Sequence, residues 1–177
     1  MSFLLRHLFI ALFASVFVAS ATANSDRPVQ QAQMQHAPQH LPAARTFKIG
    51  DIVIEAPWVR ATPQGARVAG AFMKITNTGK ESDRLVGGTL DHASRFEIHE
   101  TAIVDHVAKM RPVPNGLEIK PGATIELKPG SFHIMGMELH GGYTQGQTIK
   151  GSLIFEKAGT VSVEYVVGPM GGAAPHG

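Results

Sequence analysis

The stretch SFHIMGMEL, residues 131–139, combines side chains that can bind a soft metal ion. If this stretch is a β-strand, successive side chains point to opposite faces. One face is then apolar and typical of a core, whereas the other carries His133, Met135 and Met137. An imidazole followed by two thioethers is unusual on the face of a strand that should meet water, so the pattern calls for a chemical explanation.

A second segment, SRFEIHET at residues 94–101, shows the same alternation. Its apolar residues take the core register, and His99 takes the register of the polar face. Met110 follows eleven residues after His99, beyond a turn-like segment and close to a proline. If the strands lie side by side, His99 and Met110 converge with His133 and Met135.

Two imidazoles and two thioethers form a ligand set that suits copper(I), a soft ion that binds thioether sulfur and accepts neutral imidazole. Zinc prefers thiolate, imidazole and carboxylate ligands. A thioether needs no deprotonation, so the pH dependence of such a site comes from its histidines. Periodicity alone leaves the ordinary interpretation open, in which methionines fill a core and histidines lie at the surface.

The other histidines and methionines are weaker candidates. Met73 alternates with core residues and is expected to pack inside, whereas Met137 is expected to form a wall of the site. His92 and His140 lie near turns and are expected at the surface, and His106 is the candidate for an auxiliary ligand. Extra copper ligands on the flanking segments remain candidates, namely Met34, His36, His40, Met170 and His176.

The first 23 residues have the pattern of a secretory signal peptide. Arg6 and His7 precede an apolar run at residues 8–18, and an Ala-Thr-Ala cleavage site follows at residues 21–23. The apolar run is shorter than the roughly 20 residues of a transmembrane helix. We therefore expect signal cleavage, export to the periplasm and no membrane insertion afterwards. The chain has no cysteine, so disulfides and lipid attachment through a signal-site cysteine are both excluded.

The mature chain divides into three parts by composition. Residues 24–45 are rich in Gln, Pro and Ala and predict a flexible linker. Residues 46–167 contain short β-branched and apolar runs separated by Gly, Pro and Asn, with no helical period. This pattern predicts one all-β domain, an antiparallel sandwich or barrel. The Gly/Pro-rich residues 168–177 are expected to form a flexible tail.

Charge and residue content exclude several classes of function. The formal net charge is +2, or +1 once Arg6 leaves with the signal, which argues against nucleic acid as a partner. A blue-copper electron carrier needs a cysteine thiolate, and the chain has none. A copper monooxygenase with an N-terminal histidine is also unsuitable, because cleavage leaves Asn24. No cluster of catalytic carboxylates or nucleophiles stands out, so we expect a binding protein and not an enzyme.

The spacing resembles a known family, the periplasmic copper(I) chaperones called PCuAC (DUF461). Their signature is a His, ten residues, a Met, about twenty-one or twenty-two residues, and then His-x-Met. His99, Met110, His133 and Met135 fit this signature, with 22 residues between Met110 and His133. The flanking stretches APWVRATPQGARVAGAFMKITNTG, MRPVP and ELKPGSFHIMGM also match, and the resemblance covers roughly residues 49–167.

The resemblance implies a cupredoxin-like Greek-key β-sandwich that binds one copper(I) ion through His99, Met110, His133 and Met135. It also implies delivery of copper to the binuclear copper centre of cytochrome c oxidase, either directly or with Sco-type proteins. The rival function is copper storage or resistance, with the flanking segments as the main ligands. A purely structural sandwich is the remaining alternative. We expect a monomer.

Overall fold

The computed structural model describes residues 45–171, which form β-strands and contain no helix long and apolar enough to cross a membrane. The expected signal peptide, residues 24–44 of the linker and the last six residues lie outside this described part. The strands are β1 (Thr46–Ile49), β2 (Ile52–Arg60), β3 (Val68–Asn77), β4 (Asp83–Leu90), β5 (Ala93–Val104), β6 (Val107–Pro112), β7 (Leu117–Ile119), β8 (Thr124–Leu127), β9 (Phe132–Leu139), β10 (Thr148–Phe155) and β11 (Gly159–Gly168).

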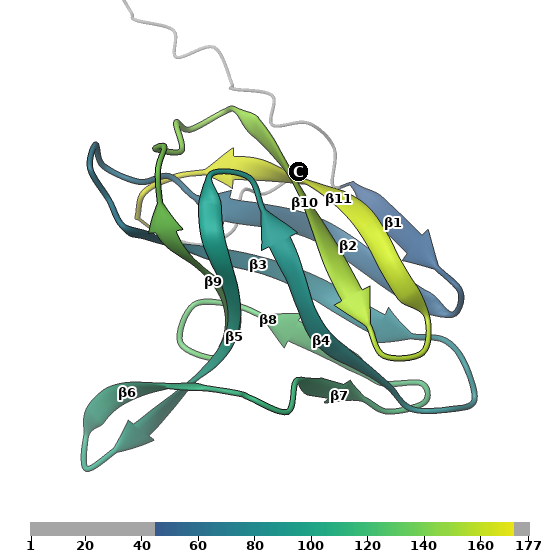
Figure 1. The fold of residues 1–177 in the computed structure, drawn as a ribbon. Coiled ribbons are helices and arrows are strands. Elements are labelled where there is room, and N and C mark those ends of the chain that lie inside the picture. Colours follow the sequence, from purple (N-terminus) through teal and green to yellow (C-terminus); the bar gives the residue numbers. More distant parts are fainter. Residues whose placement is uncertain (1–44, 172–177) are drawn as a thin grey trace, which may run out of the picture. The chain divides into compact units, whose positions relative to one another are not determined.

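The strands pair in the order β6-β5-β9-β3-β2-β11-β10-β4-β7, while β1 pairs with β2 and β8 pairs with β3. Figure 1 shows β4, β10 and β11 crossing in front of β2 and β3, so the strands enclose a single core between them. This is the all-β sandwich that the strand pattern predicts, with the cupredoxin-like architecture that the resemblance to PCuAC implies. One pairing differs from the antiparallel expectation, because β11 runs parallel to β2. A parallel pair needs a long connection, and the chain between β2 and β11 supplies it by building the rest of the domain.

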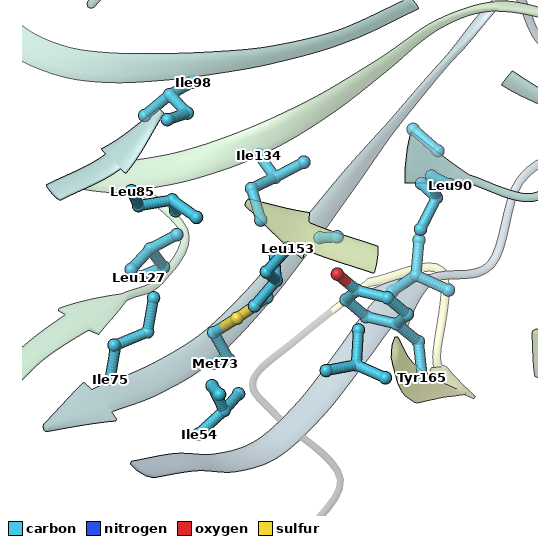
Figure 2. Close-up of a cluster of buried hydrophobic side chains, with 14 of the residues drawn as sticks. Ile54, Met73, Ile75, Leu85, Leu90, Ile98, Leu127, Ile134, Leu153 and Tyr165 are labelled. Atoms are coloured by element: carbon cyan, nitrogen blue, oxygen red, sulfur yellow. The ribbon is translucent and has the colours of Figure 1, made fainter. Parts of the chain in front are cut away.

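The core is built from the inward-facing residues of nearly every strand (Figure 2). Ile54, Ile134, Leu153 and Tyr165 are completely buried there. Met73 lies among them at 3% exposure, so its alternation with core residues correctly predicted a packing role. Burial of such side chains from several strands is the dominant stabilising contribution in a domain without disulfides.

A β-bulge in β2 changes which residues face the core. The register between β2 and β3 shifts between Glu55 and Trp58, and Ala56 has a positive φ of 49°. Before the bulge Ile54 points inward, whereas after it Val59 does. An extra residue reverses the alternation of a strand. Trp58 therefore lies outside the main core cluster, on the face of the sheet opposite to Val59.

Strands β5 and β6 form a ribbon that projects beyond the sandwich (Figure 1). Both residues of its turn, Asp105 and His106, have positive φ values of 53° and 62°, as a two-residue type I′ turn requires. All six residues of β6 are exposed. The sequence predicted only a turn-like segment before Met110, so strand β6 was not predicted.

Candidate metal centre

His99 and His133 lie directly opposite each other on paired strands. They are register partners in the antiparallel β5–β9 ladder, and their ring centroids are 5.9 Å apart with the planes at 66°. Side chains opposite one another in such a ladder lie on the same face and within contact distance. The prediction that the two strands bring these histidines together is therefore correct.

His133 is 5% exposed, although its strand register predicted a water-facing side chain. Its ring lies 6.4 Å from the ring of Phe72 on β3, which covers it from the neighbouring strand. Burial lowers the pKa of the His133 imidazole, the nearby His99 acts in the same direction, and the hydrogen bond to Ser131 opposes them. The ring is therefore neutral at neutral pH, which is the form that binds a metal ion.

The hydrogen bond to Ser131 also determines which nitrogen of His133 is free. Nδ1 lies 2.9 Å from the Ser131 carbonyl oxygen, which only accepts hydrogen bonds. Nδ1 must therefore carry the proton. In the neutral ring, Nε2 then keeps an unprotonated lone pair.

His99 has the opposite arrangement. Its Nε2 lies 2.8 Å from Oε2 of Glu97, and a carboxylate accepts, so Nε2 carries the proton. Its Nδ1 is buried and has no hydrogen-bond partner. Buried nitrogen atoms without a partner are rare and call for an explanation. A metal ion bound at Nδ1 would provide that explanation, because Nδ1 keeps its lone pair when the ring is neutral.

The two thioethers lie beside these imidazoles. Met135 and His133 from β9, and Met110 from β6, line one surface hollow of about 210 Å³. Met110 reaches it because it pairs with Thr101 on β5, two residues after His99. Met110 is 61% exposed, so the hollow is open to solvent on the side of the β5–β6 ribbon. His99 does not line the hollow and joins the group through His133, which lies opposite it on β9. We call His99, Met110, His133 and Met135 together the His–Met site.

Sequence reasoning missed the residues that support the hollow. Phe72 lies against Trp58, with ring centroids 4.5 Å apart, and the guanidinium of Arg60 lies 5.7 Å from the Phe72 centroid. The hollow is also lined by Gly70, where an added Cβ would lie 3.0 Å from the Phe72 ring. Trp58 and Arg60 were not predictable from alternation, because the bulge at Ala56 sets their face.

The remaining candidates are not part of this arrangement. His106 is at the tip of the ribbon, about 20 Å along the strand from His99. Met137 pairs with Val68 and Arg95, further along β9, and does not line the hollow. Met170 is exposed. The candidates that fall outside the described residues are Met34, His36, His40 and His176.

His92 and His140 form a second histidine pair, which the sequence did not predict. Their ring centroids are 5.9 Å apart, and both residues are exposed as expected. They lie just beyond the other end of the β5–β9 ladder, where Ala93 pairs with Leu139. The His92 ring also lies 6.3 Å from the ring of Tyr143. Within residues 45–171, neither member of this pair lines the hollow that Met110 and Met135 share, so the pair is separate from the His–Met site.

Fold and site together define a class of protein, an all-β, cupredoxin-like domain with imidazole and thioether groups gathered at its surface. The chain belongs to the family described as putative lipoprotein LpqE-like, whose model matches residues 52–167 and so includes all four residues of the His–Met site. A relative from Leifsonia xyli subsp. xyli, the putative lipoprotein Lxx21020, is 32% identical over 137 residues. That alignment covers 76% of this chain and 81% of the relative.

Solved structures show the same fold. The copper-bound PCuAC domain from PmoF2 has a TM-score of 0.61 at 24% identity and covers 71% of this chain and 98% of that domain. The solution structure of CuI-DR1885 from Deinococcus radiodurans has a TM-score of 0.55 at 25% identity and covers 72% of this chain and 83% of that one. The domain is therefore of the PCuAC type in its architecture.

Proposed function

We propose that this protein is a copper(I) chaperone of the PCuAC type, which binds one ion at the His–Met site and passes it to an acceptor protein. One observation carries the proposal. Two imidazoles each keep one nitrogen free by a defined hydrogen bond, His99 through Glu97 and His133 through Ser131. His133 lines the hollow that Met110 and Met135 also line, and His99 lies directly opposite His133 on the neighbouring strand.

The relatives support this proposal. A domain with the same fold is named copper-bound, and another, at 25% identity, is named CuI-DR1885, which indicates copper(I). The four residues of the His–Met site have the spacing of the PCuAC signature. Together with the soft character of thioether sulfur, these names favour copper(I) over zinc as the ion.

The site has the properties that a carrier needs for release. Its four ligands are neutral, and one of them, Met110, lies on the exposed ribbon at 61% exposure. A thiolate from an acceptor is a stronger ligand for copper(I) than a thioether. It can displace Met110 first and then the other ligands in turn, through an intermediate in which both proteins hold the ion. No covalent chemistry is needed, so the protein acts as a carrier and not as an enzyme.

The proposed place of action is the periplasm, because the sequence begins with a signal-peptide pattern and two matches carry the name lipoprotein. This chain has no cysteine to carry a lipid, so we propose that it acts without a lipid anchor, and we also propose that it acts as a monomer. The proposed acceptor is a Sco-type protein or the binuclear copper domain of cytochrome c oxidase.

A titration with copper(I) in competition with a chromogenic chelator tests the binding step. We expect one tightly held ion per chain, and loss of that ion in the double variant Met110→Leu, Met135→Leu. Met137→Leu is the matched control, because it removes a thioether from the same strand outside the hollow. Wild-type protein that holds no copper(I) against the chelator would leave only a structural sandwich.

Stoichiometry and transfer separate delivery from storage. Several ions per chain that persist in the double variant would favour storage by the flanking segments. Loaded protein should instead lose its ion to a Sco-type protein or to an oxidase copper domain when the two are mixed and separated. Retention of copper with both acceptors would contradict delivery to this oxidase pathway, even if binding is confirmed.

A further inference from the structure

Glu97 contacts His99 without taking a place among the proposed ligands. It lies two residues before His99 on β5 and directly opposite Met135 on β9, so it sits on the face that carries the His–Met site. Its two carboxylate oxygens have different partners. Oε2 lies 2.8 Å from Nε2 of His99, and Oε1 lies 3.4 Å from the guanidinium of Arg95.

The second contact connects the carboxylate to an exposed row of charges. Arg95 bridges Glu97 to Glu138, whose Oε1 lies 3.1 Å from Nε of Arg95. The three side chains form a row on neighbouring positions of β5 and β9. In this arrangement Oε2 of Glu97 is directed at the His99 ring and Oε1 at Arg95.

We infer that Glu97 is a positioning residue, which holds the His99 ring so that Nδ1, and not Nε2, is the atom that binds copper(I). The inference rests on the proposed function for its ligand, but its structural part concerns the metal-free protein. His99 Nδ1 is buried without a partner, whereas Nε2 is occupied by Glu97. In metal sites generally, a carboxylate on the second ring nitrogen fixes both the tautomer and the ring orientation of the ligating histidine.

The two histidines of the site would then bind through different nitrogens. His133 keeps its Nδ1 on the Ser131 carbonyl and offers Nε2, whereas His99 keeps its Nε2 on Glu97 and offers Nδ1. Both partners lie two residues before their histidine, and the difference is that Ser131 contributes its backbone carbonyl whereas Glu97 contributes its side chain. A backbone carbonyl is fixed by the fold, but a side chain can be replaced, so only the His99 half of this arrangement can be tested by substitution.

The variants are chosen to separate a hydrogen bond from a charge. Glu97→Ala removes both, whereas Glu97→Gln keeps an oxygen that accepts from Nε2 and removes only the charge. Glu138→Ala is the matched control, because it removes the same charge from the same row without touching His99. Loss of an outer partner of a ligating histidine typically lowers metal affinity by about 10-fold to 100-fold. We expect a fall of this size in Glu97→Ala, a smaller one in Glu97→Gln and almost none in Glu138→Ala.

Nitrogen-15 NMR of the imidazole rings gives a readout that a general loss of stability would not produce. In the metal-free protein, the Nε2–H signal of His99 should be protected from exchange in wild type, Glu97→Gln and Glu138→Ala, and lost in Glu97→Ala. On loading with copper(I), wild-type Nδ1 of His99 should shift while the Nε2–H signal remains. Loss of the Nε2–H signal on loading would overturn the inference, because His99 would then bind through Nε2.

Two other results would also overturn it. Equal affinities in wild type and Glu97→Ala would show that the carboxylate does not position the ligand. An equal loss in Glu138→Ala and Glu97→Ala would show that only the charge matters. If wild-type protein binds no copper(I), the proposed function fails, whereas the Nε2–H signal of the metal-free protein still tests the contact between Glu97 and His99.

Discussion

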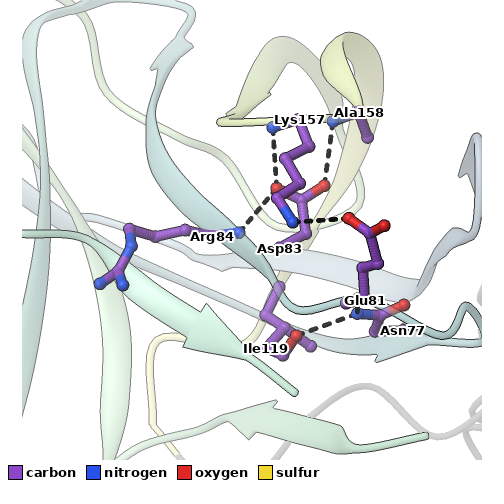
Figure 3. Close-up of polar contacts among 7 residues, drawn as sticks. All are labelled: Asn77, Glu81, Asp83, Arg84, Ile119, Lys157 and Ala158. Carbon is purple, nitrogen blue, oxygen red and sulfur yellow. Dashed lines mark hydrogen bonds and ion pairs between the residues drawn. The ribbon is translucent and has the colours of Figure 1, made fainter. Parts of the chain in front are cut away.

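Two buried polar groups of this protein differ in whether their hydrogen bonds are complete. Asp83, at the start of β4, is 7% exposed and accepts from three backbone N–H groups, those of Arg84, Lys157 and Ala158, at 2.7–3.0 Å (Figure 3). His133 is similarly buried, at 5% exposure, and its Nδ1 donates a hydrogen bond to the Ser131 carbonyl. Backbone N–H groups of the fold satisfy the Asp83 carboxylate. In the neutral His133 ring, the lone pair of Nε2 is left for a ligand such as the proposed copper(I) ion.

Asn77 strengthens the comparison because it belongs with Asp83. It is 1% exposed, donates to the carbonyls of Glu81 and Ile119, and accepts from the backbone N–H of Gly79. Figure 3 shows it in the same group of polar contacts as Asp83. Complete hydrogen bonding tells us that these residues join segments of the fold. The buried Nδ1 of His99, which has no hydrogen-bond partner, is instead what the proposed copper(I) site would use.

The largest expected effect is on stability, at Asp83. The variant Asp83→Ala leaves three backbone N–H groups without their charged acceptor, and a hydrogen bond to a charged group contributes about 1.5–3 kcal/mol. We expect the free energy of unfolding to fall by about 3 kcal/mol or more in denaturant titrations. The folded fraction should bind copper(I) as tightly as wild type. A fall in the affinity of that fraction would break the distinction between the two groups.

The next effect is on copper(I) affinity, at His133. His133→Ala removes a proposed ligand. Loss of an outer partner of a ligand lowers metal affinity by up to about 100-fold, or about 2.7 kcal/mol, and we expect His133→Ala to lower the copper(I) affinity by more than this. Chelator competition measures it. The double variant His92→Ala, His140→Ala is the matched control, since that pair has the same 5.9 Å ring separation and does not line the hollow. Equal losses in the two variants would show that any histidine pair on this sheet suffices.

Two buried tyrosines give a smaller effect of opposite sign. The hydroxyl of Tyr165 is buried without a hydrogen-bond partner, whereas that of Tyr143 donates to the carbonyl of Asp91. We expect Tyr165→Phe to stabilise the protein by about 1 kcal/mol, because it removes an unsatisfied hydroxyl, and Tyr143→Phe to destabilise it by about the same amount. Thermal unfolding followed by calorimetry compares them. A loss of stability in Tyr165→Phe would show that its hydroxyl has a partner such as water.

The smallest effect is the acid dependence of stability. Burial acts to raise the pKa of Asp83, but the backbone N–H groups of Lys157, Arg84 and Ala158 and the Lys157 charge outweigh it, so the pKa lies below its usual value. A lowered pKa in the folded state stabilises the protein above the unfolded pKa, near 4, and this contribution is lost as the pH falls further. Stability should therefore decline below about pH 4 more steeply in wild type than in Asp83→Asn. Parallel declines would mean that other carboxyl groups dominate.

Alternation and turn residues predicted most of the fold. The strand runs around Ile54, Met73, Ile134 and Leu153 were each bounded by Gly, Pro or Asn, and all four residues lie in the core. Strand β6 was missed because its hairpin turn is Asp105-His106, which lacks the glycine that usually marks a two-residue turn.

The candidate ligands were also found from their spacing, but their surroundings were not. Alternation correctly placed His133 opposite the core face, yet it says nothing about neighbouring strands, so the cover provided by Phe72 was invisible. The bulge at Ala56, which brings Trp58 and Arg60 to that face, depends on one local backbone conformation. Glu97 lies in the same register as His99, but only the folded structure shows that the two side chains are in contact.

X-ray absorption at the copper edge tests the central claim most directly, because it reports the atoms around the bound ion. The loaded wild-type protein should show two nitrogen and two sulfur neighbours around a single copper(I) ion. The sulfur contribution should disappear in Met110→Leu, Met135→Leu. A spectrum with nitrogen or oxygen neighbours alone, or one that is unchanged in the double variant, would contradict the His–Met site.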